Sequence, residues 1–322
     1  MKLLRTCTTA LLVATSLFHA IPSGAQPAFP SKPVHWIVPF PPGGAAEIAS
    51  RVIANRLRTV WGQPVLIDSK PGAGTIIGTE AIAKSAPDGH TFGLVITAHV
   101  VNPTLRKLPY DTLKDLTGVS QLVNLHLAFI AHASAPYNNI ADLVAYSKVN
   151  PGKVNFGTVG AGTSSHLFGE LLNVATGSSV VHIAYKGSSP LQADVLGGSI
   201  SLMVDALASQ LPMINSGKMK VIALAASKRH PDYPFPLASE TFPGVIADSF
   251  FGLVAPAATP RDIINKLNRD IVEALAFPEV RDRIVQLGLI PVGSAPAEFD
   301  ALIRSEIARW AKVIEQSKVK LD

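Results

Sequence analysis

The stretch Val34-His-Trp-Ile-Val-Pro-Phe-Pro-Pro-Gly-Gly-Ala-Ala-Glu47 decides the fold, together with a second stretch of the same build, Val154-Asn-Phe-Gly-Thr-Val-Gly-Ala-Gly-Thr-Ser-Ser-His166. Each stretch predicts a short apolar strand, a glycine-rich turn and the first turn of an amphipathic helix. A helix start leaves about four backbone N–H groups without partners and carries a partial positive charge. Glycine lets a bound group approach that backbone closely, so each turn suits an anion. Two such turns, far apart in the chain, predict a receptor that holds a small anion between two lobes.

The N-terminus predicts export. Lys2 and Arg5 precede the apolar run Leu11-Leu-Val-Ala-Thr-Ser-Leu-Phe18, which is too short to span a bilayer. Ser23 and Ala25 place small residues at the two positions that a signal peptidase recognises. We therefore expect residues 1–25 to be a signal peptide, cleaved after Ala25, and the mature protein to be periplasmic. An uncleaved anchor or a buried first helix is the alternative.

Composition argues against several classes of protein. The chain is 48% apolar and 16% charged, and its formal net charge is +5, which slightly favours an anionic ligand. The basic residues are spread out, so no nucleic-acid partner is expected. The single cysteine, Cys7, would leave with the signal peptide, and the histidines lack the spacing of a metal-binding helix. Gly72-Ala-Gly74 with Gly78 resembles a dinucleotide fingerprint, but the last spacing is off by one. A tight turn at a helix start is the better interpretation, and we expect neither metal nor cofactor.

Short apolar runs alternate with helical patterns along the chain. The pattern predicts strands at Val34–Val38, Val65–Asp68, Phe92–Ile96, Ala128–Ala131, Val154–Phe156, Val180–Ile183, Ser201–Val204, Val221–Ala225 and Phe251–Val254. Three helices stand out by their apolar stripes: Ile48, Ala49, Val52, Ile53, Leu57 and Val60; Ile263, Ile264, Leu267, Ile271 and Leu275, after Thr259 as N-cap; and Phe299, Leu302, Ile303, Ile307, Trp310 and Ile314. This alternation predicts an α/β fold with mainly parallel sheets covered by helices. Ligands of such sheets lie beyond the carboxyl ends of the strands.

The length of the mature chain, about 297 residues, favours two domains. No long hydrophilic linker divides it, so the chain must cross between lobes on strands. We place the first crossing near Asn124–Ala131 and the return near Ser249–Ala255. The predicted lobe 1 is then discontinuous, formed by 27–124 plus 251–322, and lobe 2 comprises 125–250.

A hydrolase is the rival interpretation. Ser164, Ser165 and His166 are suggestive of acyl transfer, but no Gly-x-Ser-x-Gly elbow surrounds them. Nor does the sequence show a base with an orienting partner, so we expect no catalytic residues. Asp205 ends an apolar strand, where a carboxylate seldom lies without a partner. It is either a helix cap or a hydrogen-bond acceptor in the cleft, and both alternatives stay open.

The chain resembles the Bug family, the periplasmic receptors of tripartite tricarboxylate transporters, over essentially its whole mature length. The resemblance rests on short motifs in the family's order: Ile37-Val-Pro-Phe-Pro-Pro-Gly-Gly44, Pro71-Gly-Ala-Gly74, Pro87-Asp-Gly89, Leu108-Pro-Tyr-Asp111, Pro151-Gly-Lys153, His166-Leu-Phe-Gly-Glu170, Tyr185-Lys-Gly187, Leu196-Gly-Gly198, Gly217-Lys218, Phe251-Gly-Leu253 and Ala255-Pro-Ala-Ala-Thr-Pro260. It implies a two-lobed type II periplasmic-binding fold, a Venus flytrap, that closes on a small organic acid. It further implies no enzyme activity and, as partners, the membrane subunits of a transporter. We expect a monomer.

The resemblance also implies the ligand contacts. The family's first pocket loop falls on Phe40, Pro41, Pro42, Gly43, Gly44 and Ala45, and its second on Gly160, Ala161, Gly162, Thr163, Ser164, Ser165 and His166. In the family these loops hold one ligand carboxylate by backbone N–H groups, hydroxyls and water. Asp205 corresponds to an acidic position near the cleft. Just past a strand end, Thr97 and His99 are further candidates.

Glu47 is where this chain departs from the family, which usually has Asp there. A carboxylate at this position either pairs with a ligand ammonium group or stabilises its own helix start, where a negative charge is favourable. Dicarboxylates, aromatic carboxylates such as nicotinate or terephthalate, and acidic amino acids are all ligands within the family. The pocket loops contain no arginine, so dipoles and hydroxyls must do much of the anion binding. Phe40 could flank a flat ring, which favours an aromatic or apolar acid.

Overall fold

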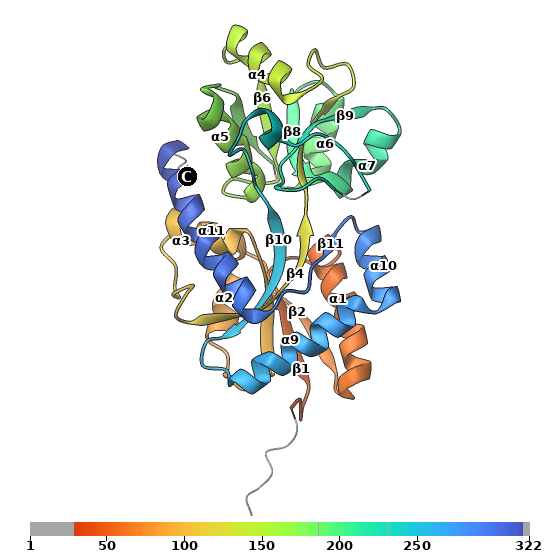
Figure 1. Cartoon of the computed structure of the whole chain (residues 1–322), viewed down its shortest axis with the longest axis vertical. Helices are drawn as coiled ribbons and strands as arrows, with labels where there is room; N and C mark the ends of the chain where they lie inside the picture. Colours follow the sequence, from red (N-terminus) through yellow and green to blue (C-terminus); the bar gives the residue numbers. More distant parts are fainter. Residues whose placement is uncertain (1–28, 186, 231, 318–322) are drawn as a thin grey trace, which may run out of the picture.

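The computed structural model describes residues 29–185, 187–230 and 232–317, and in this part of the chain it has two lobes, each built on one sheet (Figure 1). The sheet of lobe 1 has the strand order β11-β4-β10-β3-β1-β2, and that of lobe 2 the order β7-β6-β8-β5-β9. The predicted signal peptide, residues 1–25, lies outside the described residues. No helix among those described combines the length and hydropathy needed to cross a membrane.

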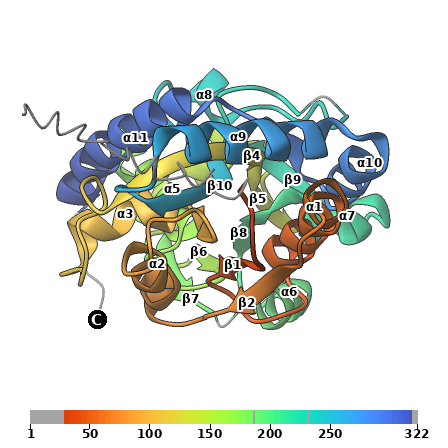
Figure 2. The ribbon, with the colours of Figure 1, turned by 90° about the horizontal axis from the view of Figure 1, so that it is seen from below.

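Lobe 1 takes its elements from both ends of the chain. Its strands are β1 (Val34–Val38), β2 (Val65–Ser69), β3 (Thr91–Ile96), β4 (Leu116–Leu125), β10 (Ser249–Pro256) and β11 (Ile290–Pro291). Its helices are α1 (Ala45–Trp61), the 3-10 turn η1 (Ala73–Thr75), α2 (Ile76–Ala83), α3 (Ala98–Leu105), α9 (Arg261–Ala276), α10 (Pro278–Gln286) and α11 (Pro296–Ser317). In the view from below, α9 and α11 run along one margin of the molecule and the edge strand β2 lies at the other (Figure 2).

Lobe 2 is formed by the middle of the chain. Its strands are β5 (Leu127–His132), β6 (Asn155–Thr158), β7 (Val181–Ala184), β8 (Leu202–Ala206) and β9 (Met219–Leu224). Its helices are α4 (Ile140–Val149), α5 (Ser164–Thr176), α6 (Ser188–Leu196), α7 (Leu207–Asn215) and α8 (Ala238–Thr241). Two chain segments cross between the lobes: the junction of β4 and β5 at His126, and the segment that leads into β10. The residue limits of the lobes stay the prediction made from the sequence.

The two-lobed α/β fold is confirmed, but its sheets are mixed rather than mainly parallel. β1 pairs in parallel with β2 and β3, whereas β10 runs antiparallel to both β3 and β4. In lobe 2, β6 pairs in parallel with β7 and β8, whereas β5 runs antiparallel to β8 and β9. The crossings explain the difference. β4 and β5 carry the chain out of lobe 1 and β10 carries it back, so these strands need no crossover helix.

Several helix details differ from the sequence prediction. Helix α9 begins one residue later than expected, because Pro260 is still extended (ψ 141°) and is the N-cap in place of Thr259. On α1, Ala49, Ile53 and Leu57 are buried as predicted, but Val60 is 50% exposed.

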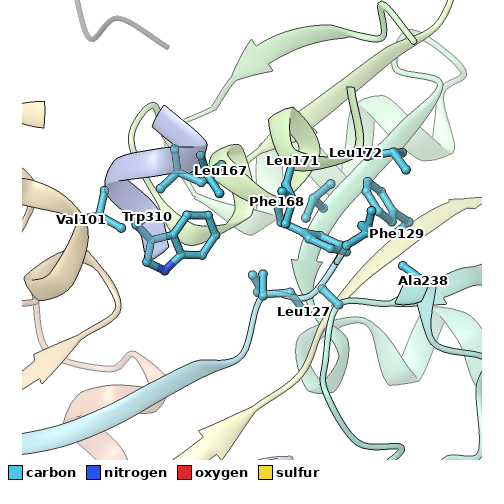
Figure 3. Close-up of a cluster of buried hydrophobic side chains, with 14 of the residues drawn as sticks. Val101, Leu127, Phe129, Leu167, Phe168, Leu171, Leu172, Ala238 and Trp310 are labelled. Atoms are coloured by element: carbon cyan, nitrogen blue, oxygen red, sulfur yellow. The ribbon is translucent and has the colours of Figure 1, made fainter. Parts of the chain in front are cut away.

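One apolar cluster extends across both lobes. On lobe 1 it includes residues of α3 and α11, and on lobe 2 residues of β5 and α5. Figure 3 shows Trp310 of α11 between Val101 of α3 and Leu167 of α5, with Phe168 and Phe129 beyond. All five side chains are at most 1% exposed. The last third of α11 therefore packs against both lobes, on the side away from β2.

Candidate functional site

Two glycine-rich turns face each other across the gap between the lobes. The first turn, residues 39–44, connects β1 to α1, and the second turn, residues 159–163, connects β6 to α5. The first turn follows the carboxyl end of β1 and the second that of β6, and residues of both turns line one cavity. Gly43 (φ +91°) and Gly162 (φ +75°) adopt backbone conformations that favour glycine. Both stretches therefore form a strand, a glycine-rich turn and a helix start, as the sequence predicts.

A cavity of about 210 Å³ lies between the two turns. Most of its wall is apolar and comes from three glycine-rich turns and from helix α3. It is lined by Pro39, Phe40, Pro41, Pro71, Gly72, Gly74, Thr75, Ile96, Ala98, Asn102, Arg106, Ala161, Gly162 and Thr163. Larger hollows lie elsewhere on the surface, one of about 540 Å³ beside Tyr110. We take the smaller cavity as the site because both turns line it.

In the first turn, Glu47 serves the turn itself. Its carboxylate accepts a hydrogen bond from the Gly43 N–H (3.2 Å) and another from Nε of Arg51 (2.7 Å), whose terminal nitrogen also contacts it. The side chain of Glu47 is buried. Of the two alternatives for Glu47, these contacts favour the local one. The N–H groups that helix α1 leaves unpaired at Ala45 and Ala46 remain available to a ligand.

The second turn, like the first, is stabilised by a hydrogen bond from a glycine N–H to a side chain four residues later. Thr163 caps α5: its hydroxyl donates to the Gly160 carbonyl (2.7 Å) and accepts from the His166 N–H (3.4 Å). The Gly162 N–H donates to Nδ1 of His166 (3.0 Å), four residues on, as Gly43 does to Glu47. The glycine amides thus stabilise the turns. Ser164 and Ser165 have no hydrogen-bond partner for their hydroxyls among the described residues, so both remain free for a ligand.

Behind the second turn, His166 stacks on His182, with ring centroids 3.7 Å apart. Burial lowers the pKa of both imidazoles to about 4, and the charge of His166 further lowers the pKa of His182. Nε2 of His166 lies 3.8 Å from Glu170, whose own pKa is raised by burial. His166 is therefore neutral at physiological pH. The second turn presents dipoles and hydroxyls to the gap, not a cation.

Asp205 lies outside the lining of the cavity. Its carboxylate accepts from the Ala206 N–H (2.8 Å) and from the Gln210 amide (2.8 Å), at the start of α7. It is only 4% exposed, and burial raises its pKa. These partners favour the helix-start alternative. A ligand contact by Asp205 stays an untested prediction.

Thr97 and His99 are also buried away from the cavity. The Thr97 hydroxyl accepts from the Phe250 N–H (3.4 Å). His99 faces the space between α3 and α11, where burial lowers its pKa to about 4 and neither ring nitrogen has a hydrogen-bond partner. Successive residues of a helix point about 100° apart. Ala98 and Asn102 therefore line the cavity from the same helix while His99 does not.

The cavity touches some predicted residues and not others. Phe40, Pro41, Gly162 and Thr163 line it, together with Ala161. Gly43, Gly44 and Ala45 are exposed just beyond Pro41, and Ser164, Ser165 and His166 follow Thr163 into α5. These six lie in the two turns or in the helix starts that follow them, without being part of the cavity wall.

Sequence reasoning missed the contribution of α3 and of the third turn, residues 71–75. Gly72 (φ +130°) and Gly74 (φ +62°) form a tight turn before α2, the interpretation preferred over a dinucleotide fingerprint. The Asn102 amide donates to the Gly74 carbonyl (2.9 Å) and fixes this turn. Arg106 completes the wall. The four-residue spacing of Ala98, Asn102 and Arg106 was the available signal.

A family model described as tripartite tricarboxylate transporter family receptor matches residues 49–319. The chain belongs to this receptor family. Protein BugT of Bordetella pertussis is 35% identical to it over 322 residues, an alignment that covers 97% of this chain and 99% of BugT. The resemblance to the Bug family is thereby confirmed.

Two solved structures of the receptor family hold carboxylates. The R. palustris protein Rpa4515, with adipate, has a TM-score of 0.80 and 30% identity, covering 91% of this chain and 99% of its own. MatC from Rhodopseudomonas palustris, with bound malate, has a TM-score of 0.76 and 30% identity, covering 89% and 100%. The family is thus one of periplasmic solute-binding receptors, and relatives of this chain bind small carboxylates.

Proposed function

We propose that this protein is a periplasmic receptor that binds a small organic carboxylate, a dicarboxylate or an aromatic carboxylate, between its two lobes. It then supplies the ligand to the membrane subunits of a tripartite tricarboxylate-type transporter. The observation that carries the proposal is the cavity enclosed by both glycine-rich turns. The bound adipate and malate of the two relatives support it. The proposal includes export with cleavage after Ala25, action as a monomer, and lobes formed by 27–124 plus 251–322 and by 125–250.

The mode of anion binding follows from the two turns. Each ends at a helix start, whose unpaired N–H groups and partial positive charge favour an anion. On the second turn, the free hydroxyls of Ser164 and Ser165 add donors. None of the residues that line the cavity is Asp or Glu, so nothing there repels a carboxylate.

The two rival functions find less support. A hydrolase needs a base beside its nucleophile, but Nδ1 of His166 is engaged by the Gly162 N–H, and neither Ser164 nor Ser165 is bonded to the ring. An acidic amino acid needs a partner for its ammonium group. Glu47 is already bonded to Arg51 and to the turn, and the cavity wall holds no carboxylate. We therefore propose a receptor without catalytic activity or cofactor.

The test of the function is a melting-temperature screen of the mature protein against acids and their uncharged amides, such as adipate with adipamide and nicotinate with nicotinamide. A ligand at 100 times its Kd adds about 2.7 kcal/mol to the stability of the native state. For a chain of this length we expect a rise of several degrees with an acid and none with its amide. A shift produced only by amides, sugars or metal ions would contradict the proposal.

Substitutions in the turns test whether the helix starts hold the anion. A hydrogen bond to a charged group contributes about 1.5–3 kcal/mol, so Ser165→Ala should lower the affinity for the acid found in the screen by roughly tenfold to a hundredfold. Gly44→Val should also weaken binding, because its side chain would cover the N–H groups of α1. An added Cβ at Gly44 meets no atom within 4 Å, so this variant should fold.

Calorimetric titration measures both affinities, with Ser305→Ala on the exposed face of α11 as the control. If Ser165→Ala and Gly44→Val both bind like the wild type, the ligand does not contact the helix starts.

A further inference from the structure

Arg106 stands at the end of α3, where the chain leaves the helix. Its N–H donates to the Asn102 carbonyl (2.9 Å), and its backbone is already extended (φ −142°, ψ 150°). The side chain lines the interlobe cavity on one side and the larger hollow beside Tyr110 and Ile307 on the other. Arg106 is therefore part of the wall that separates the two spaces.

The guanidinium of Arg106 has no ion pair and no hydrogen bond among the described residues. Its Nε is buried without an acceptor. Three other arginines form ion pairs, Arg51 with Glu47, Arg229 with Glu240 and Arg309 with Glu306. A buried donor without a partner is unfavourable, and more so on a charged group. Arginine cannot relieve this by losing its proton. An anion from outside the chain would satisfy it.

Charge in the cavity is confined to this one residue. Among the lining residues Arg106 alone is ionisable, and most of the rest of the wall is apolar, including Pro39, Phe40, Pro71, Ile96 and Ala98. A ligand that fits this wall has an apolar body. It would present one anionic group to the dipoles and hydroxyls of the glycine-rich turns and another to the guanidinium.

We propose that Arg106 binds a second anionic group of the ligand and thereby selects dicarboxylates with an apolar body over monocarboxylates of the same shape. This inference rests on the proposed function, since it assumes that a carboxylate enters the cavity. A guanidinium can form two parallel hydrogen bonds to a carboxylate, which gives direction as well as charge. The choice between one and two negative charges would then be made on α3, outside both family pocket loops.

The test compares matched acids on matched variants. The acids are adipate with hexanoate, and terephthalate with benzoate, which differ by one carboxylate on the same body. The variants are Arg106→Gln and Lys107→Gln, because Lys107 is the exposed neighbour and its removal changes the net charge equally. Arg106→Lys keeps the charge but loses the paired donors. Titration calorimetry at constant ionic strength gives each Kd, and melting curves check that each variant folds.

We expect the wild type to prefer the dicarboxylate of each pair. Arg106→Gln should weaken dicarboxylate binding by on the order of tenfold to a hundredfold and leave monocarboxylate binding unchanged. The dicarboxylate affinity of Arg106→Lys should lie between those of the wild type and Arg106→Gln. The affinity of Lys107→Gln should match that of the wild type.

Three results would overturn the inference. Equal losses for both acids of a pair would show a merely structural role for Arg106. A wild type that prefers monocarboxylates would overturn selection by charge and leave the proposed function standing. If the wild type binds none of the four acids and no other carboxylate of the screen, both the proposed function and this inference are overturned.

Discussion

Replacement of Ala161 by tryptophan is expected to abolish carboxylate binding while the free protein melts at nearly the same temperature. Ala161 is exposed on the second turn and lines the interlobe cavity of about 210 Å³. Tryptophan is the largest side chain and buries roughly 150–250 Å² of surface. On the cavity wall it would project into this space and hold the lobes apart. Affinity should fall by on the order of a hundredfold or more, since the ligand would lose contacts with one turn altogether.

Calorimetry with the best acid of the screen measures the effect of Ala161→Trp. Ala258→Trp, in the exposed loop between β10 and α9, is the matched control and should bind normally. Wild-type affinity in the Ala161 variant would place the ligand outside the cavity, and the two-turn site would have to be abandoned.

Substitution of His99 by leucine is expected to protect the protein against acid. His99 is fully buried with both ring nitrogens unpartnered, and its pKa is lowered from 6.5 to about 4. The unfolded chain therefore binds a proton below pH 6.5 that the folded chain accepts only near pH 4. Stability that is present above pH 6.5 is lost as the pH falls through this window. At pH 5 this histidine alone costs about 2 kcal/mol of the free energy of unfolding.

Leucine does not titrate, so the His99→Leu variant should gain about 2 kcal/mol relative to the wild type between pH 7.5 and pH 5. Urea unfolding at both pH values measures the change, and any packing difference cancels because the same two proteins are compared. Glu170 acts in the opposite direction, because its raised pKa stabilises the fold as the pH falls, and it is unchanged in both proteins. Parallel pH curves for variant and wild type would refute the assignment to His99.

Most of the fold could be predicted because its strands are short apolar runs bounded by turn residues. All nine predicted strands occur, with ends within about two residues of their expected positions. β4 was missed because polar Thr117, Ser120 and Gln121 interrupt it without regular alternation. Ser120 is buried, and its hydroxyl donates to the Ser294 carbonyl (2.8 Å). Such a strand becomes recognisable only when its partners β10 and β11 are known.

The site was predictable where chemistry is local and unpredictable where it depends on packing. The two turns were recognisable because a strand, a glycine turn and a helix start follow one another in the sequence, and the family resemblance assigned Phe40, Pro41, Gly162 and Thr163 to the pocket loops. Arg106 was missed because the four-residue spacing of Ala98, Asn102 and Arg106 indicates a shared face, but not that this face approaches a turn in the other lobe. For the same reason His99, next to a strand end, was expected to reach the ligand but faces the opposite side of its helix.

The position of Trp310 gives the molecule a built-in optical reporter. The chain has three tryptophans, of which Trp36 packs on Phe92 inside lobe 1 and Trp61 is hydrogen-bonded to Asp270 of the same lobe. Trp310 alone among them packs against both lobes (Figure 3). Its emission is therefore expected to change when the contact between the lobes changes. The emission of Trp36 and Trp61, whose contacts lie within lobe 1, is expected to stay constant. Because cleavage after Ala25 would remove Cys7 and leave no thiol for a dye, rapid-mixing fluorescence of the unlabelled protein offers a direct route to the kinetics of closure.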